Sequence, residues 1–268
     1  MKTPKANLPG ILRIHDKARS LIATSSLALL LALPAGAATL SFTPDRDTAL
    51  AGGTFAGDNF GTGELWAGNS TTGTPQRSIL SFDVSGLDGL YSSIDSITLT
   101  LTLNLYDATL ASLTNQVHAV APANQGWVEG QATWNSRATS TSWAGSVGLG
   151  TAGTDYDSTL LSAVSITTGA SAGTAYNFTF TGATVALTSL IDAWLVDNVD
   201  NAQANPGLLL LDPSAPHASW NRTIWYSDET ATQASYKPTL SVNYSAIPEP
   251  SAALLGGLGL LALLRRRR

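Results

Sequence analysis

Apolar and polar residues alternate along several stretches of the chain. Between Ile97 and Leu105 every second residue is apolar, and threonine or asparagine fills most positions between them. A period of two places the apolar side chains on one face of a β-strand and the polar ones on the other. Further short runs that predict strands, each bounded by glycine, proline, asparagine or aspartate, occupy residues 77–84, 175–182, 207–212, 222–227 and 238–244.

Many short strands with turn-rich connections predict an all-β fold, an antiparallel β-sandwich of the jelly-roll type. One segment differs, because apolar residues within 184–198 recur at intervals of three and four and so predict a short helix packed on the sandwich. Residues 138–175, rich in glycine, serine, threonine and alanine, are expected to form loops with one or two edge strands.

The first 38 residues have the features of a secretory signal peptide. Basic residues are concentrated in residues 1–20, an apolar run follows at 21–33, and Ala35, Ala37 and Ala38 supply the small side chains that a signal peptidase reads. We expect residues 1–38 to be removed on export, which leaves residues 39–246 as the β-sandwich.

The last 22 residues combine three features in order. Pro248, Glu249 and Pro250 precede 13 apolar or glycine residues, and the chain ends in Arg265, Arg266, Arg267 and Arg268. As a helix the apolar run would extend about 20 Å, less than the roughly 30 Å of a bilayer core. The arginine cluster would remain on the cytoplasmic side of the membrane.

This tail, residues 247–268, resembles the PEP-CTERM sorting signal. The resemblance implies processing near Pro248–Pro250 by an exosortase, an inner-membrane enzyme of Gram-negative bacteria that make exopolysaccharide. It also implies that the secretion machinery exports the protein, that the C-terminal hydrophobic helix anchors it transiently in the inner membrane, and that it reaches the cell surface or extracellular matrix.

Without the two ends, the chain is strongly acidic. Residues 39–246 retain 5 basic and 17 acidic residues, a net charge of −12. Such a surface repels nucleic acid, anionic lipid and acidic polysaccharide, so we expect no nucleic-acid partner. The chain also contains no cysteine, which excludes disulfides, thiolate catalysis and cysteine metal sites.

Five segments resemble the DNRLRE domain in their order along the chain. They comprise residues 58–87, 97–106, 127–135, 187–212 and 224–244. The resemblance extends over nearly all of residues 39–245 and implies a β-sandwich often described as a carbohydrate-binding module. Some members bind acidic polysaccharide through basic residues, whereas the charge here favours a neutral glycan or an acidic one bridged by calcium.

Seven tryptophans are candidates for stacking against sugar rings. Trp127, Trp134 and Trp194 fit core positions of the resembled family. Three others have glycine-, serine- or asparagine-rich surroundings where a loop could expose them, and Trp225 and Tyr226 are adjacent, so one points into a strand's core face and the other out. The candidate ligand contacts are therefore Trp66, Trp143, Trp220, Trp225 and Tyr226, with loop anchoring as the alternative role.

Paired carboxylates offer hard oxygen ligands that could bind a structural calcium ion. We select Asp45 with Asp47 and Asp197 with Asp200, none of which has the spacing of an EF-hand loop. The alternative is that these side chains only solvate loops and keep the protein soluble.

The sequence favours a non-catalytic surface or matrix protein, sorted by an exosortase, that contributes to exopolysaccharide structure or adhesion. The alternatives are a carbohydrate-binding module and a polysaccharide hydrolase or lyase. Residues 169–173 match G-x-S-x-G around Ser171, with Asp192 and His217 following, but this motif requires a strand-to-helix turn that the surrounding sequence does not predict.

Overall fold

The computed structural model describes residues 36–70, 73–181, 186–200, 205–247, 256–259 and 263–266. The side chains of Thr181, Asn198 and Asp200 are excluded from this description. The chain divides into a compact unit, Ala37–Ala246, and a second unit formed by its two ends. Among the described residues no helix has both the length and the apolar composition needed to cross a membrane.

Most of the predicted processing features fall on residues that are not described. Ala35, the Pro248–Pro250 motif, Arg267 and Arg268 lie outside the described residues. Arg265 and Arg266 lie in a helical turn at 263–266. Ala37 and Ala38 form the start of a strand, where they pair with Ser245 and Tyr244.

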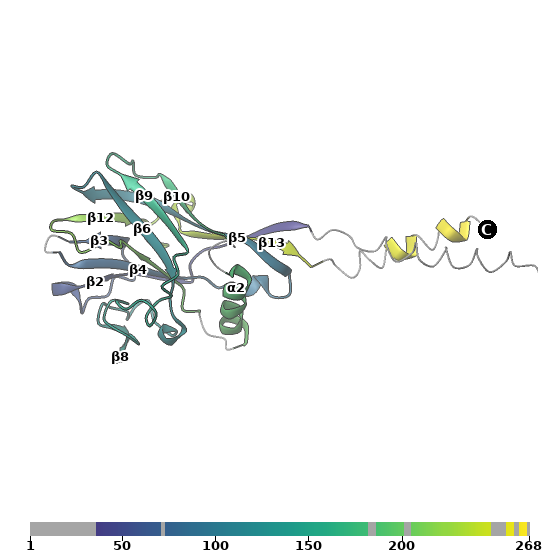
Figure 1. Ribbon diagram of the computed structural model, residues 1–268, viewed down its shortest axis with the longest axis horizontal. Coiled ribbons are helices and arrows are strands. Elements are labelled where there is room, and N and C mark those ends of the chain that lie inside the picture. Colours follow the sequence, from purple (N-terminus) through teal and green to yellow (C-terminus); the bar gives the residue numbers. More distant parts are fainter. Residues whose placement is uncertain are drawn as a thin grey trace, which may run out of the picture. The chain divides into compact units, whose positions relative to one another are not determined.

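The unit Ala37–Ala246 is an antiparallel β-sandwich, which confirms the predicted all-β class (Figure 1). One sheet contains β1 (Ala37–Phe42), β13 (Thr239–Ala246), the first part of β5 (Tyr91–Ala108) and β10 (Ala175–Thr181). The other contains β2 (Arg46–Ala51), β3 (Leu65–Asn69), β4 (Pro75–Ser81), β6 (Ser112–Ala119), β9 (Ser162–Thr167), β11 (Leu208–Leu211), β12 (Asn221–Trp225) and the end of β5. A separate hairpin joins β7 (Ser136–Ala138) to β8 (Thr141–Ser142).

The long strand β5 links the two sheets. Its first part pairs with β13 and β10, and its last residues pair with β12. Apolar residues from Ile97 to Leu103 are buried between the sheets as predicted, but Leu105 is 51% exposed. A register shift places Leu103 opposite Trp225 and Leu105 opposite Ile224, so the extra residue of this bulge turns Leu105 to the outer face.

The predicted helix is present as α2 (Leu187–Leu195). Leu187, Ile191 and Trp194 face the core between the sheets, as their spacing indicates. The helix continues into a π-helical turn, Val196–Asp200.

A second apolar cluster lies on the outer face of the second sheet. The four leucines of β11 alternate between the two clusters, with Leu208 and Leu210 in the inter-sheet core and Leu209 and Leu211 in the outer one. Trp127, Trp134, Trp143 and Leu149 of the connection between β6 and β9 complete the outer cluster. The strand is therefore buried on both faces, as its uninterrupted apolar run permits.

We name the connection at residues 120–161 the covering segment. Asp155 fixes its conformation, because its buried carboxylate accepts hydrogen bonds from the main-chain N–H groups of Gly145 (2.7 Å), Ser146 (2.9 Å) and Thr151 (2.9 Å). Burial raises the pKa of Asp155, but these main-chain donors outweigh burial and leave the pKa below its ordinary value of 3.8.

Replacing this carboxylate should loosen the covering segment. Asp155→Asn puts an N–H₂ group where an acceptor oxygen now meets main-chain donors, and we expect the free energy of unfolding to fall by about 2–3 kcal/mol in urea denaturation. The stabilisation is present above pH 3.8 and is lost as the pH falls through the lower folded-state pKa, so the difference from wild type should shrink in acid.

Asp157→Asn is the matched control for this prediction. The Asp157 carboxylate accepts one local hydrogen bond, from the main-chain N–H of Thr159 (2.8 Å). Its replacement should cost no more than about 1 kcal/mol. An equal loss in the two variants would contradict the anchoring role of Asp155.

Candidate functional site

A groove of about 250 Å³ crosses the outer face of β3, β4 and β12. Trp66 points to this face because its neighbours Leu65 and Ala67 point into the inter-sheet core. Arg222 points the same way from the adjacent strand β12. We name this site the aromatic groove; its lining residues are Phe55, Phe60, Trp66, Ser70, Gln76, Trp220 and Arg222.

One wall of the aromatic groove consists of Phe60 and Trp66. Their rings meet edge to face with centroids 4.7 Å apart. Ser78 holds β3 in place there, because its Oγ accepts from the Trp66 N–H (2.7 Å) and donates to the Trp66 carbonyl (2.9 Å). The main chain at Trp66 is therefore held by Ser78, and its indole packs on Phe60.

The Arg222 side chain lies close to both indoles of the aromatic groove. Its guanidinium carbon lies 4.5 Å from the Trp220 ring centroid and 5.3 Å from that of Trp66. Arg222 Nε donates to Asp107 Oδ2 (3.1 Å), and a second guanidinium nitrogen donates to Gln76 Oε1 (3.3 Å). The Trp220 indole N–H donates to the same Asp107 oxygen, so the side chains are ordered before any ligand arrives.

The structure brings together two of the five predicted ligand contacts, Trp66 and Trp220. The expectation that a loop exposes Trp143 is wrong, because Trp143 is 5% exposed and its indole N–H donates to the Thr133 carbonyl (3.0 Å). Trp225 is fully buried in the inter-sheet core.

Tyr226, the remaining predicted contact, is the outward member of its pair with Trp225. It is half-buried and stacks on Tyr236, with centroids 5.1 Å apart. Tyr226 does not line the aromatic groove. Phe60, Gln76 and Arg222 do line it, although the sequence did not single them out. Along β12, alternation from the buried Trp225 could have placed Arg222 on the outer face, the face to which Trp66 points.

A group of three carboxylates lies at a second place, where β2 meets two loops. We name Asp47, Glu129 and Glu229 the carboxylate cluster; each offers an oxygen within 4.8 Å of the others, so the cluster could bind a metal ion. The main-chain N–H of Asp47 donates to Glu129 Oε1 (2.7 Å), and Asp47 Oδ2 accepts from the N–H of Asp228 (3.0 Å).

Burial raises the pKa of Asp47 to about 8, although the N–H of Asp228 acts in the opposite direction. The negative charges of Glu229 and Glu129 add to this rise. Burial also raises the pKa of Glu129. These carboxyl groups disfavour their ionised forms when no cation lies among them.

Of the predicted calcium ligands, only Asp47 belongs to the carboxylate cluster. Asp45 is exposed and lies outside it. Asp197 is half-buried beside Trp194 and Tyr156, at a different groove next to α2. The side chain of Asp200 lies outside the described residues. Local pairs in sequence therefore did not identify the cluster, whose members come from three distant segments.

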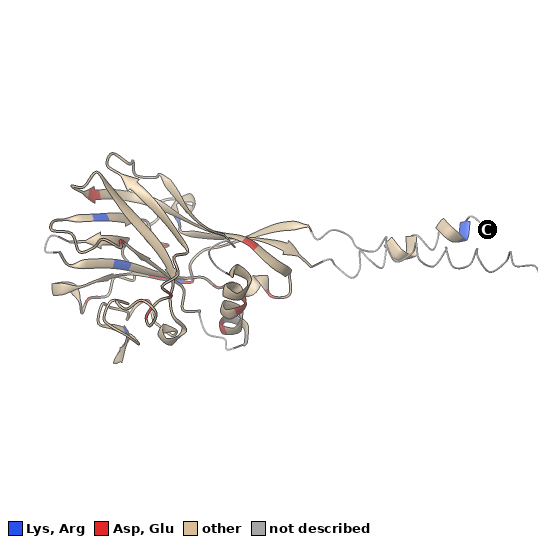
Figure 2. Ribbon diagram, viewed as in Figure 1, with Lys and Arg blue, Asp and Glu red and all other residues tan. Residues whose placement is uncertain are grey.

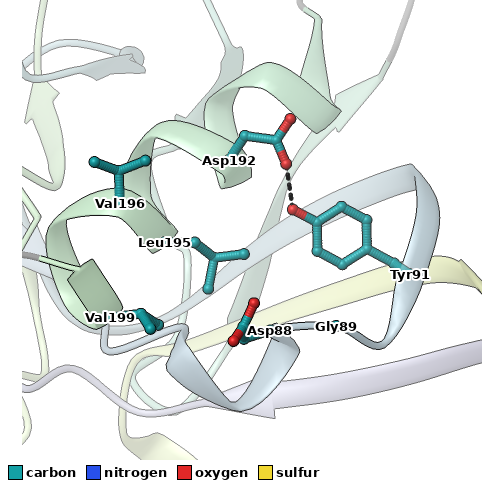
Figure 3. Close-up of a pocket in the computed structure, with 7 residues that line it drawn as sticks. All are labelled: Asp88, Gly89, Tyr91, Asp192, Leu195, Val196 and Val199. Carbon is teal, nitrogen blue, oxygen red and sulfur yellow. Dashed lines mark hydrogen bonds between the residues drawn. The ribbon is translucent and has the colours of Figure 1, made fainter.

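Another groove lies between α2 and the start of β5 (Figure 3). The Tyr91 hydroxyl donates to Asp192 Oδ1 at its rim, while Leu195, Val196 and Val199 supply apolar side chains. Burial, followed by the hydrogen bond and charge of Asp192, raises the pKa of Tyr91. Tyr91 is the one aromatic residue that lines this groove, which suits ring stacking less well than the aromatic groove.

The residues of the G-x-S-x-G alternative have other partners. Asp192 accepts from Tyr91, and His217 Nε2 lies 2.6 Å from Asp212 Oδ2. Ser171 lies in a turn that leads into strand β10 rather than a helix. The local structure thus lacks the turn geometry of a nucleophile elbow.

Comparison with known proteins identifies the family of this fold. A search of curated proteins found no significant match. The family model of carbohydrate-binding module family 96, however, matches residues 38–207, which include Trp66 and Gln76 of the aromatic groove and Asp47 and Glu129 of the carboxylate cluster. The chain belongs to carbohydrate-binding module family 96.

Proposed function

We propose that this protein is a non-catalytic carbohydrate-binding protein that holds a neutral glycan in the aromatic groove. The observation that carries the proposal is the pair of indoles, Trp66 and Trp220, that line one groove and both contact Arg222 in a member of a carbohydrate-binding family. Carbohydrate-binding modules are typically non-catalytic, and the family membership supports this binding function over the matrix role that the sequence favoured.

The groove combines the two kinds of surface that a sugar needs. Indole and phenyl faces can cover the apolar C–H face of a sugar ring at low cost in conformational entropy. Gln76, Ser70 and Arg222 supply hydrogen-bonding groups for its hydroxyls. These polar groups belong to strands or strand ends, which fix their direction relative to the rings.

Charge favours a neutral ligand. Arg222 is the one basic residue among those that line the groove, and Asp107 pairs with it. Residues 39–246 carry a net charge of −12, and in Figure 2 only short parts of the ribbon of Ala37–Ala246 have the blue colour of lysine and arginine. No acidic residue lines the described part of the groove, so calcium bridging of an acidic glycan has no support at this place.

We also propose that the protein is exported and sorted through its two ends. The basic, apolar and small residues of positions 1–38 and the Pro-Glu-Pro, apolar and arginine features of positions 247–268 support this proposal. Cleavage after Ala38 would preserve the β1–β13 pairs from Thr39 with Asn243 to Phe42 with Leu240. The glycan-binding unit would then act at the cell surface or in the extracellular matrix.

Removing either indole should weaken glycan binding. In affinity electrophoresis through gels that contain neutral polysaccharides, Trp66→Ala and Trp220→Ala should each bind roughly tenfold more weakly, because each loses one stacking surface. Circular dichroism and Tm verify that both variants fold.

Tyr226→Ala is the matched control, since it removes a half-exposed aromatic ring outside the groove. In the same gels, the glycan should retard the migration of Tyr226→Ala as much as that of the wild-type protein. Failure of the wild-type protein to bind any neutral glycan, or unchanged binding in both tryptophan variants, would refute the proposed site.

Intact-mass spectrometry of protein recovered from an exosortase-bearing host tests the sorting proposal. We expect the loss of residues 1–38 and of the chain beyond the Pro-Glu-Pro motif. A variant lacking residues 248–268 should lose this C-terminal processing and the transient association with membranes. A surface-recovered mass that still contains residues 254–268 would instead identify the tail as a lasting anchor.

A further inference from the structure

The carboxylate cluster joins three parts of the chain that are far apart in sequence. Asp47 lies in β2, Glu129 lies in the covering segment 82 residues later, and Glu229 lies in the turn after β12. The main-chain N–H of Asp47 donates to the Glu129 carboxylate, and the main-chain N–H of Asp228 donates to the Asp47 carboxylate. These two hydrogen bonds hold the segments together. The three carboxylates therefore converge through the fold and not through a local loop.

The burial of Asp47 distinguishes this cluster from a group of acidic side chains that only face solvent. The residue is 1% exposed, and its Oδ1 atom is buried without a hydrogen-bond partner, although Oδ2 has one. A buried carboxylate oxygen without a donor is costly. A cation among the three side chains would satisfy this oxygen and offset the repulsion between the charges.

The nearby basic side chains bind elsewhere. Lys237 Nζ pairs with Asp228 (2.9 Å), and the Arg46 guanidinium donates to the carbonyls of Trp127 and Asn205. Arg46 acts electrostatically on Glu129, but none of the ion pairs between described residues includes a member of the cluster. Protein cations thus leave the cluster without a direct counter-ion.

We propose that Asp47, Glu129 and Glu229 bind one calcium ion, which fastens the covering segment and the turn after β12 to strand β2. The ligands are carboxylate oxygens alone, which favours a hard cation. Ca²⁺ tolerates the irregular geometry of ligands from three segments better than Mg²⁺, which requires a near-ideal octahedron. Glu229 is exposed, so the ion can enter from solvent and retain water ligands.

Binding at this site would also support the aromatic groove. Asn59 Nδ2 donates to the Glu129 carbonyl (2.5 Å) and to the Ala132 carbonyl (2.7 Å). At Gly61 an added Cβ would lie 2.6 Å from the Glu129 carbonyl oxygen, so residues 59–61 pack closely on the chain around Glu129. Phe60, a wall of the groove, lies between these two contacts.

The test is calcium-dependent thermal stability of the purified protein, which needs no glycan and is independent of the proposed sugar binding. After treatment with a chelator, addition of about 10 mM CaCl₂ exceeds the roughly 0.1–1 mM dissociation constants of many extracellular calcium sites. We expect Tm to rise by about 3–6 °C in a saturable manner. Isothermal titration calorimetry should give one ion per chain, and MgCl₂ should have a smaller effect.

Substitutions assign the effect to these side chains. Asp47→Asn should abolish the calcium-induced rise in Tm, and Glu229→Gln, at an exposed position that should not impair folding, should weaken calcium binding at least tenfold. Asp95→Asn, which removes one exposed carboxylate from β5, should respond as wild type does.

Three results would overturn the proposal. They are no calcium-dependent change in Tm or heat in the wild-type protein, the same change in Glu229→Gln as in wild type, and an equal response to magnesium and calcium. The tryptophan variants should lose glycan binding but keep the calcium response. The glycan-binding proposal and the calcium proposal can therefore fail independently of each other.

Discussion

Burial of β11 on both faces is the constraint on which the rest of the structure depends. A sheet in a sandwich normally buries one face, but Leu209 and Leu211 need apolar partners on the other. The covering segment supplies them through Trp127, Trp134 and Trp143. Two side chains then hold the segment. Asp155 accepts hydrogen bonds from its main-chain N–H groups, and Arg77 donates to its main-chain carbonyls.

This covering extends over only part of the sheet. It packs on Leu50 of β2 and Ile79 of β4, whereas the outward side chains of β3 and β12, Trp66 and Arg222, lie in the aromatic groove. Tryptophans thus lie on this face of the sheet in two ways: those of the covering segment are buried against β11, and those of the aromatic groove form a surface beside it. Whether an indole is buried depends on which strand lies beneath it, and its local composition does not decide this.

That dependence explains how far the sequence could predict the fold and the site. Alternation identified β5 and the three- and four-residue spacing identified α2, because both signals are local. Leu105 departed from the alternation because pairing with β12 introduces a bulge. The glycine-rich surroundings of Trp143 suggested exposure, yet Thr133 and the outer cluster enclose it. Asp47 was a candidate ligand, but its partners Glu129 and Glu229 meet it only through long-range pairing.

The distribution of charge connects the two sites. Residues 39–246 contain five basic residues, and all five contact main-chain carbonyls or carboxylates within the unit: Arg46, Arg77, Arg137, Arg222 and Lys237. Arg222 can therefore order the aromatic groove without making it attractive to anions, because Asp107 pairs with it. The carboxylate cluster has no such partner among the described ion pairs, so an external cation could supply the counter-charge that these side chains lack. Since residues 59–61 pack against Glu129, neutralisation of that cluster would also steady the wall of the groove that Phe60 forms.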